Sequence, residues 1–143
     1  MIASGVFDLL HLGHVKFLEA AKKEGGKNAK LIVIVARDHT VKKTKGRKPI
    51  IPENQRVALI NSLKVVDEAL LGYENLDIVE IINKIKPEVI VLGYDQKVME
   101  KSVQDYVNCT DANIKIVKIG KFGKDALDSS SKILRKIIEK FSR

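Results

Sequence analysis

Short apolar runs bounded by turn-forming residues recur along the chain and predict five β-strands. The runs LIVIVA at 31–36 and VIVL at 89–92 are continuous and rich in β-branched residues. Such runs are typical of strands that are buried on both faces of a parallel sheet. The predicted strands span residues 1–3, 31–36, 69–71, 89–92 and 114–119.

Helical patterns separate these runs. The four isoleucines of residues 78–85 recur at i, i+3, i+4 and i+7, and Pro87 ends that helix. Another helix is predicted to begin near Pro52 and Glu53, because proline and an acidic side chain suit a first helical turn. A last helix is predicted at 130–141, with five apolar residues on its inner face: Ile133, Leu134, Ile137, Ile138 and Phe141.

Strands that alternate with helices predict an α/β fold with a parallel sheet. We expect a single Rossmann-like domain over residues 1–143, with a five-stranded parallel sheet and helices on both faces. The stretch RDHTVKKTKGRKPII at 37–51 is predicted to be a long polar loop, and loops of that length in compact domains are usually functional.

Composition narrows the class of protein. Hydrophobic residues make up 45% of the chain and charged residues 31%, a globular balance that offers no membrane span. The net charge of +8 favours anionic partners, whereas the 5% of aromatic residues argues against single-stranded nucleic acid. The only cysteine, Cys109, excludes an internal disulfide, and no signal peptide is visible, so we expect a reducing cytoplasm.

The segment around residues 4–14 predicts an anion site. If the first strand ends at Gly5, the amides of Val6 and Phe7 and the start of a helix near Gly13 would meet at the end of the strand where α/β sheets bind ligands. His11 and His14 lie three apart there and could stabilise charge on phosphate oxygens. Two histidines at this spacing are also common as ordinary surface residues, and a metal site is disfavoured because no third ligand is near.

The segment GVFDLLHLGH at 5–14 resembles the signature GxFDxxHxGH of the nucleotidylyltransferase superfamily at every fixed position. DSSSKIL at 128–134 is similar to the family's ISSTKI segment, with Asp128 for the usual isoleucine and Ser131 for the usual threonine. The hydroxyls of Ser129, Ser130 and Ser131 remain for phosphate contacts, and they would also serve as an ordinary helix cap.

Two further segments resemble the archaeal FAD synthases within this family. In residues 35–56, Lys45 and Arg47 match the positions that clamp the β and γ phosphates, and Arg56 matches a family arginine. A solvated loop is the alternative for any one lysine, such as Lys42 or Lys43. VLGYDQ at 91–96 places Gly93 and Asp95 after a strand, where they would meet the ribose or base.

The resemblance implies transfer of AMP from ATP to FMN, with release of pyrophosphate. It implies Mg²⁺ or another divalent cation bound mainly through the nucleotide's phosphates, no metal ligands from the protein, and a homodimer with neither nucleic acid nor membrane as a partner. Catalytic roles fall to His11, His14, Lys45 and Arg47. The nucleotide-binding set is Gly5, Val6, Phe7, His11, Leu12, Gly13, His14, Gly93, Asp95, Phe122, Ser129, Ser130 and Ser131, and Asp8, Arg56 and Lys124 are predicted to contact phosphate or to support those that do.

Other functions fit parts of the pattern. A cytidylyltransferase that uses CTP and glycerol 3-phosphate, or a similar small phosphate, would share the catalytic motifs. Phe122 beside an adenine, and Lys124 where cytidylyltransferases have arginine, favour ATP. A pantetheine-phosphate adenylyltransferase is less compatible with the KGRK segment, and a non-catalytic nucleic-acid or nucleotide-binding module is suggested by charge alone.

Overall fold

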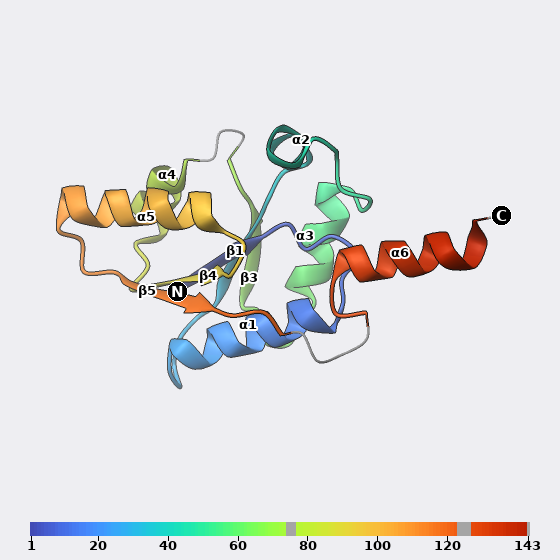
Figure 1. Cartoon of the computed structure of the whole chain (residues 1–143). Coiled ribbons are helices and arrows are strands. Elements are labelled where there is room, and N and C mark those ends of the chain that lie inside the picture. The colour runs from blue at the N-terminus through green and yellow to red at the C-terminus, as the bar shows by residue number, and fades with distance from the viewer. Residues whose placement is uncertain (74–76, 123–126, 143) are drawn as a thin grey trace.

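A parallel sheet with strand order β3-β2-β1-β4-β5 organises the molecule in the computed structural model, which describes residues 1–73, 77–122 and 127–142 (Figure 1). Each strand pairs in parallel with its neighbours. The strands in the described part of the chain are β1 (Ile2–Gly5), β2 (Ile32–Val35), β3 (Glu68–Leu71), β4 (Val89–Gly93) and β5 (Lys115–Ile119). The five predicted strands are confirmed, with shifts of one or two residues at their ends.

Helices connect the strands and cover both faces of the sheet (Figure 1). The predicted helices at 53, 78–85 and 130–141 are confirmed. The helices among the described residues are α1 (Leu12–Glu24), α2 (Asp38–Lys45), α3 (Glu53–Asn61), α4 (Ile78–Ile85), α5 (Lys97–Thr110) and α6 (Ser130–Phe141). The predicted fold, an α/β sheet of five parallel strands with helices on both faces, is therefore confirmed.

The core consists of two apolar clusters, one on each face of the sheet. On one face, Leu18 of α1 and Ile60 of α3 pack against Val33 and its neighbours on the inner strands. On the other face, α4 and α5 cover the alternate side chains of the same strands, including Ile90 of β4. Because successive strand residues point to opposite faces, β1 and β4 contribute to both clusters and are held from both sides.

The predicted loop at 37–51 is wrong over half its length, because residues 38–45 form α2. Only Thr40 and Val41 of this helix are buried. A helix with one buried apolar residue shows no helical periodicity in its sequence, so the pattern could not indicate it. Gly46, with φ 79° in the left-handed region, ends the helix and turns the chain.

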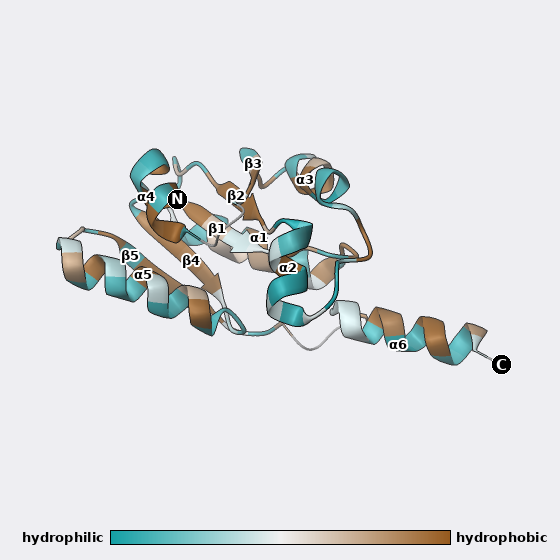
Figure 2. Ribbon diagram, turned by 90° about the horizontal axis from the view of Figure 1, so that it is seen from above, coloured by the Kyte–Doolittle hydropathy of each residue, from teal (hydrophilic) through white to brown (hydrophobic). Residues whose placement is uncertain are grey.

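The predicted inner face of α6 is also wrong. None of the residues of this helix is buried, and Ile137, Ile138 and Phe141 are 47%, 63% and 73% exposed. Figures 1 and 2 show why: the helix extends away from the sheet. Cys109, the only cysteine, is exposed on α5. An amphipathic pattern predicts that one face of a helix packs against an apolar surface, but it does not identify that surface.

Within the described residues, no helix combines the length and the apolar character needed to cross a bilayer.

We expect Leu18→Ala to lower the free energy of unfolding by about 2–5 kcal/mol, because the side chain is fully buried between α1 and the sheet. Leu59→Ala is the matched control on α3, since Leu59 is 42% exposed and should cost about 1 kcal/mol or less. Urea denaturation of both variants measures the difference. Equal losses would contradict the assignment of the core.

Candidate active site

A cleft of about 400 Å³ opens at the carboxyl ends of β1 and β4. These central strands have connections that leave in opposite directions along the sheet, β1 toward β2 and β4 toward β5. This reversal is the place where open α/β sheets bind ligands. Walls of the cleft come from the loop after β1, the start of α1, the segment after α2, the turn after β4, the end of β5 and the start of α6.

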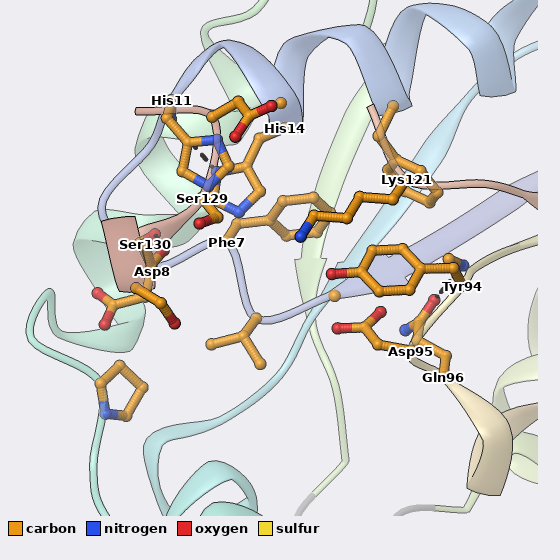
Figure 3. A pocket seen from close by; sticks show the side chains of 18 of the residues that line it. Phe7, Asp8, His11, His14, Tyr94, Asp95, Gln96, Lys121, Ser129 and Ser130 are labelled. Atoms are coloured by element: carbon orange, nitrogen blue, oxygen red, sulfur yellow. Dashed lines mark hydrogen bonds between the residues drawn. The ribbon is translucent and has the colours of Figure 1, made fainter. Parts of the chain in front are cut away.

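His11 and His14 line the cleft as a stacked pair (Figure 3). Their ring centroids are 3.7 Å apart with an angle of 23° between the planes. The backbone N–H of His11 donates to Nδ1 of His14 over 3.3 Å. Since Nδ1 of His14 accepts this bond, a neutral His14 carries its proton on Nε2, the atom left for a ligand.

Burial changes the protonation of both rings. The pKa of His14 is lowered from 6.5 to about 4, chiefly by desolvation and then by the neighbouring charge of His11, against the opposing effect of Asp8. Desolvation also lowers the pKa of His11, while the charge of Asp128 raises it. His14 is therefore neutral near pH 7 and can donate a hydrogen bond without carrying a charge.

The glycines of the first motif make room for close neighbours. A Cβ on Gly5 would lie 2.9 Å from the ring of Phe7, which is buried and meets His14 edge to face at 5.4 Å. A Cβ on Gly13 would lie 2.4 Å from the carbonyl oxygen of Asp128. Gly5 thus lets Phe7 support the histidine pair, and Gly13 lets the segment before α6 touch the start of α1. The spacing of glycines in the sequence does not show that these two positions need glycine for these contacts.

Asp8 connects three segments of the cleft. Its carboxylate accepts the N–H groups of Ile50 and Ile51, at 2.8 and 2.9 Å, and that of Leu9 at 3.1 Å. Its carbonyl oxygen accepts the hydroxyl of Ser130 at 2.6 Å. The structure therefore shows how Asp8 can play its predicted supporting role: it holds residues 45–51, the basic segment, and the start of α6 to the loop after β1.

Arg56 does not reach the cleft, although the sequence allowed a phosphate contact. Its side chain is 0% exposed. It donates to the carbonyl oxygens of Val6, Ala36 and Ile51 over 2.7–2.8 Å and pairs with Asp38 at 2.6 Å. Because the guanidinium is fully buried and bonds to backbone and Asp38 rather than facing the cleft, only its predicted indirect role fits the structure.

Two groups of polar side chains line the cleft. Lys45 and Arg47, with the unpredicted Lys48, line it on either side of the turn at Gly46. Ser129, Ser130 and Ser131 line it at the start of α6, where Ser129 caps the helix by accepting the N–H of Lys132 at 3.3 Å. Basic side chains and a helix N-terminus on one cavity are suited to a polyphosphate.

The opposite end of the cleft is formed by the turn after β4 (Figure 3). Gly93, Asp95 and Phe122 line it as predicted. Tyr94 and Lys121 line it as well, with Lys121 Nζ 5.9 Å from the centre of the tyrosine ring. Tyr94 and Lys121 are sequence neighbours of predicted residues and follow the ends of β4 and β5. Their position after a strand end is the signal that could have identified them.

Gln96 was also missed by the sequence reasoning. Its amide nitrogen donates to the carbonyl and hydroxyl oxygens of Ser4, each at 3.0 Å, and its amide oxygen accepts the N–H of Gly93 at 2.7 Å. Gln96 thus ties the ends of β1 and β4 together beneath the cleft. No pattern in the sequence indicates a hydrogen bond between residues that are 92 positions apart.

Two predicted site residues lie elsewhere. The side chain of Leu12 is 49% exposed and does not line the cleft, because the first turn of α1 points it outward. Lys124 lies outside the described residues. The described residues hold no group of three or more histidine, cysteine, aspartate or glutamate side chains suited to a metal ion.

Several known proteins are similar to this chain in sequence or in fold. Residues 2–137 match the family model described as cytidylyltransferase-like. A protein of Methanopyrus kandleri named FAD synthase is 45% identical over 143 residues, covering 100% of this chain and 94% of its own. A FAD synthase of Methanothermus fervidus is 48% identical over 136 residues, covering 95% and 92%.

Among solved structures, a protein of Thermoplasma volcanium titled as a lipopolysaccharide core biosynthesis protein is similar, with a TM-score of 0.75 and 47% identity. The match covers 85% of this chain and 96% of that one. A protein of unknown function from Archaeoglobus fulgidus has a TM-score of 0.64 at 19% identity, which shows the shared fold alone.

The lowered pKa of His14 predicts a loss of stability in acid. The unfolded chain binds a proton at 6.5 and the folded chain only near 4, so stability from the neutral ring is present above pH 6.5 and is lost as pH falls toward 4. Between pH 7.5 and 4, we expect the unfolding free energy to fall by about 3 kcal/mol more in the wild type than in His14→Asn. Urea denaturation measures this, and an NMR titration of His14 near 6.5 would contradict it.

Proposed function

This chain belongs to the cytidylyltransferase-like family, and we propose that it transfers AMP from ATP to FMN, giving FAD and pyrophosphate. The observation that carries the proposal is that two FAD synthases are 45% and 48% identical to this chain over nearly its full length. In addition, the histidine pair, the basic segment and the serine-rich start of α6 line one cleft. A nucleotide triphosphate and a phosphorylated acceptor both suit such a cationic cavity.

The proposed chemistry is an in-line displacement at the α-phosphate. An oxygen of the FMN phosphate forms a bond to this phosphorus while the bond to the bridging oxygen of the pyrophosphate breaks. The attacking oxygen is already anionic near neutral pH, so no general base is needed, and positioning and charge stabilisation supply the catalysis.

Each predicted catalytic residue has a proposed role. Nε2–H of His14 donates to the α-phosphate oxygens, where its neutral state avoids the cost of a buried charge. His11 stabilises charge on the α-phosphate and the bridging oxygen. Lys45 and Arg47 hold the departing pyrophosphate, with the hydroxyls of the serines at the start of α6 on the phosphate chain.

The nucleotide base and ribose are proposed to lie at the other end of the cleft. Tyr94 and Phe122 offer aromatic faces there, and Asp95 offers a carboxylate for ribose hydroxyls. The amide groups of Val6 and Phe7 lie between the two ends, after β1.

Mg²⁺ or another divalent cation, bound mainly through the phosphates, would neutralise charge on the triphosphate. The cleft fits such an ion. Asp8 uses both carboxylate oxygens on backbone N–H groups, and the cationic side chains of the basic segment leave the ligation of a metal to phosphate and water.

A cytidylyltransferase acting on CTP and glycerol 3-phosphate is the alternative, because it would use the same histidines and basic residues. The cleft wall at Tyr94 and Phe122 suits a purine at least as well as a pyrimidine, which favours ATP. A binding module without turnover would not need the single tautomer in which His14 is held. Cytoplasmic location and the absence of nucleic-acid and membrane partners remain predictions from the sequence.

We expect His14→Ala to lower kcat for FAD formation about a hundredfold or more, since it removes a hydrogen-bond donor to the transition state. His39→Ala is the matched control, because His39 is exposed on α2 and does not line the cleft. Pyrophosphate release with ATP and FMN measures both. Activity of His14→Ala within a few-fold of wild type, with an unchanged fold, would contradict the role of His14.

A substrate panel separates the proposed function from its alternatives. ATP with FMN should give the largest rate of pyrophosphate release. Strong activity with CTP and glycerol 3-phosphate would select the alternative enzyme, and salt-sensitive binding to long polyanions without turnover would select a binding module.

We also propose a homodimer in which a second copy covers α6. The exposed stripe of Ile137, Ile138 and Phe141 supports this, because an uncovered apolar helix face is costly in water. Sedimentation at micromolar concentration should give a dimer for the wild type and for the control Lys140→Glu, and a monomer for Ile138→Glu. A monomeric wild type would contradict the proposal.

A further inference from the structure

The side-chain amide of Gln96 lies between the two central strands at the point where their backbone pairing ends. The register of β1 with β4 ends at the pair of Ala3 and Val91, whereas β4 continues to Gly93. Beyond that pair, the N–H of Gly93 donates to Oε1 of Gln96 at 2.7 Å, and Nε2 of Gln96 donates to the carbonyl oxygen of Ser4 at 3.0 Å. The amide therefore bridges the two strands at the floor of the cleft.

This bridge has a single orientation. A backbone N–H can only donate and a backbone carbonyl can only accept. Gly93 therefore requires the oxygen of the Gln96 amide, and the carbonyl of Ser4 requires its nitrogen. Nε2 also donates to the hydroxyl oxygen of Ser4 at 3.0 Å, so both N–H groups of the amide are used on Ser4.

The hydroxyl of Ser4 is consequently an acceptor in the bridge and has its own proton left to donate. A serine hydroxyl carries one O–H and two lone pairs, and Gln96 occupies one of the lone pairs. In the part of the chain that the structure describes, no oxygen or nitrogen accepts this proton. Because Ser4 lines the cleft, the O–H is available to a molecule bound there.

The carboxylate of Asp95 decides which kind of group suits this donor. The point where Gly93 would carry a Cβ is 3.2 Å from Oδ1 of Asp95 and 3.5 Å from Oε1 of Gln96. Figure 3 shows the two side chains together, at the end of the cleft opposite the histidine pair. An ionised carboxylate only accepts hydrogen bonds, and it repels a phosphate. A neutral hydroxyl accepts one hydrogen bond and donates another, so it satisfies Ser4 and Asp95 together.

We propose that Ser4 is a further substrate-binding residue, whose O–H donates to a sugar hydroxyl of the substrate, and that Gln96 is the positioning residue that makes Ser4 a donor. The assignment rests on the proposed function for the identity of the substrate. That reaction offers two sources of such a hydroxyl, the ribose of the nucleotide and the ribityl chain of FMN. A substrate without the recognised hydroxyl leaves the O–H of Ser4 without its acceptor and binds less tightly.

Calorimetric titration of the whole protein with ATP, 2′-deoxy-ATP and 3′-deoxy-ATP, in the absence of FMN, tests the ribose. Ser4→Ala should weaken ATP binding about three- to tenfold, the usual effect of one neutral hydrogen bond. It should leave unchanged the affinity for the deoxy form that lacks the recognised hydroxyl. Ser4→Thr keeps a hydroxyl and should bind ATP as the wild type does.

Ser102→Ala is the matched control. The hydroxyl of Ser102 donates to the carbonyl oxygen of Val98 within α5, and Ser102 does not line the cleft, so every affinity should stay at the wild-type value.

The KM for FMN, and for an FMN analogue with a deoxygenated ribityl chain, tests the other source. If the hydroxyl belongs to FMN, Ser4→Ala should raise the KM for FMN about three- to tenfold and leave both the KM for the analogue and the affinity for ATP unchanged. Wild-type affinities for both substrates in Ser4→Ala would overturn the proposal. Equal weakening of a substrate and its deoxy forms would also overturn it, because the lost contact would then lie outside the sugar.

Gln96→Glu tests the positioning role. The new carboxylate accepts a hydrogen bond where Nε2 donates one, so it draws the O–H of Ser4 away from the substrate. This variant should lose the discrimination against the deoxy substrate although Ser4 is intact, whereas Gln96→Met removes the bridge without offering an acceptor and should keep part of it. A merely structural bridge would lower the unfolding free energy equally in both variants and leave the wild-type discrimination in both, which would overturn the role of Gln96.

Failure of the proposed function gives a different result from failure of this assignment. Ribose is common to ATP and CTP, so if CTP proved to be the substrate, titrations with CTP and its deoxy forms would decide the role of Ser4. Turnover of ATP and FMN by the wild type, with unchanged affinities in Ser4→Ala, would contradict the role of Ser4 alone. A wild type that binds no ribonucleotide would contradict both.

Discussion

The buried guanidinium of Arg56 is the constraint on which one wall of the cleft depends. Its donors hold carbonyl oxygens from the loop after β1, the end of β2 and the segment before α3, and Asp38 balances its charge. A charge this deep in the protein is tolerated only when all its hydrogen bonds are made. The loop that carries Val6 and Asp8 is therefore fixed relative to the basic segment before any ligand arrives.

Preorganisation matters here because the proposed reaction has little covalent chemistry for the protein to perform. Asp8 extends the network of Arg56 by holding Ile50 and Ile51 and, through Ser130, the start of α6. The three segments that face the phosphates are thus parts of one hydrogen-bonded frame. Donors held in such a frame need not reorganise as charge develops, which is the main source of electrostatic catalysis.

The residues that the sequence missed share one property: their roles depend on contacts between distant segments. Gln96 joins β4 to β1, and Lys121 follows β5 but meets Tyr94 after β4. The sequence also left open which of two roles Arg56 has, because spacing does not show whether a side chain points into a cleft or into the interior. The apolar stripe of α6 showed an amphipathic helix and could not show that its residues stay unburied among the described parts of the chain.

The sequence by itself determined the strands, most of the helices and the place of the site, because period, glycine position and motif order are local properties that a chain carries in any fold. It also marked the histidines and the serines, since these residues lie at helix starts, whereas Lys45 and Arg47 were marked by the resemblance to a known family. Only the tertiary structure decided that the pKa of His14 is lowered by burial and that Arg56 supports the site from inside. The burial of a side chain and the charges around it depend on residues that are far apart in the chain. A local sequence pattern therefore cannot indicate them.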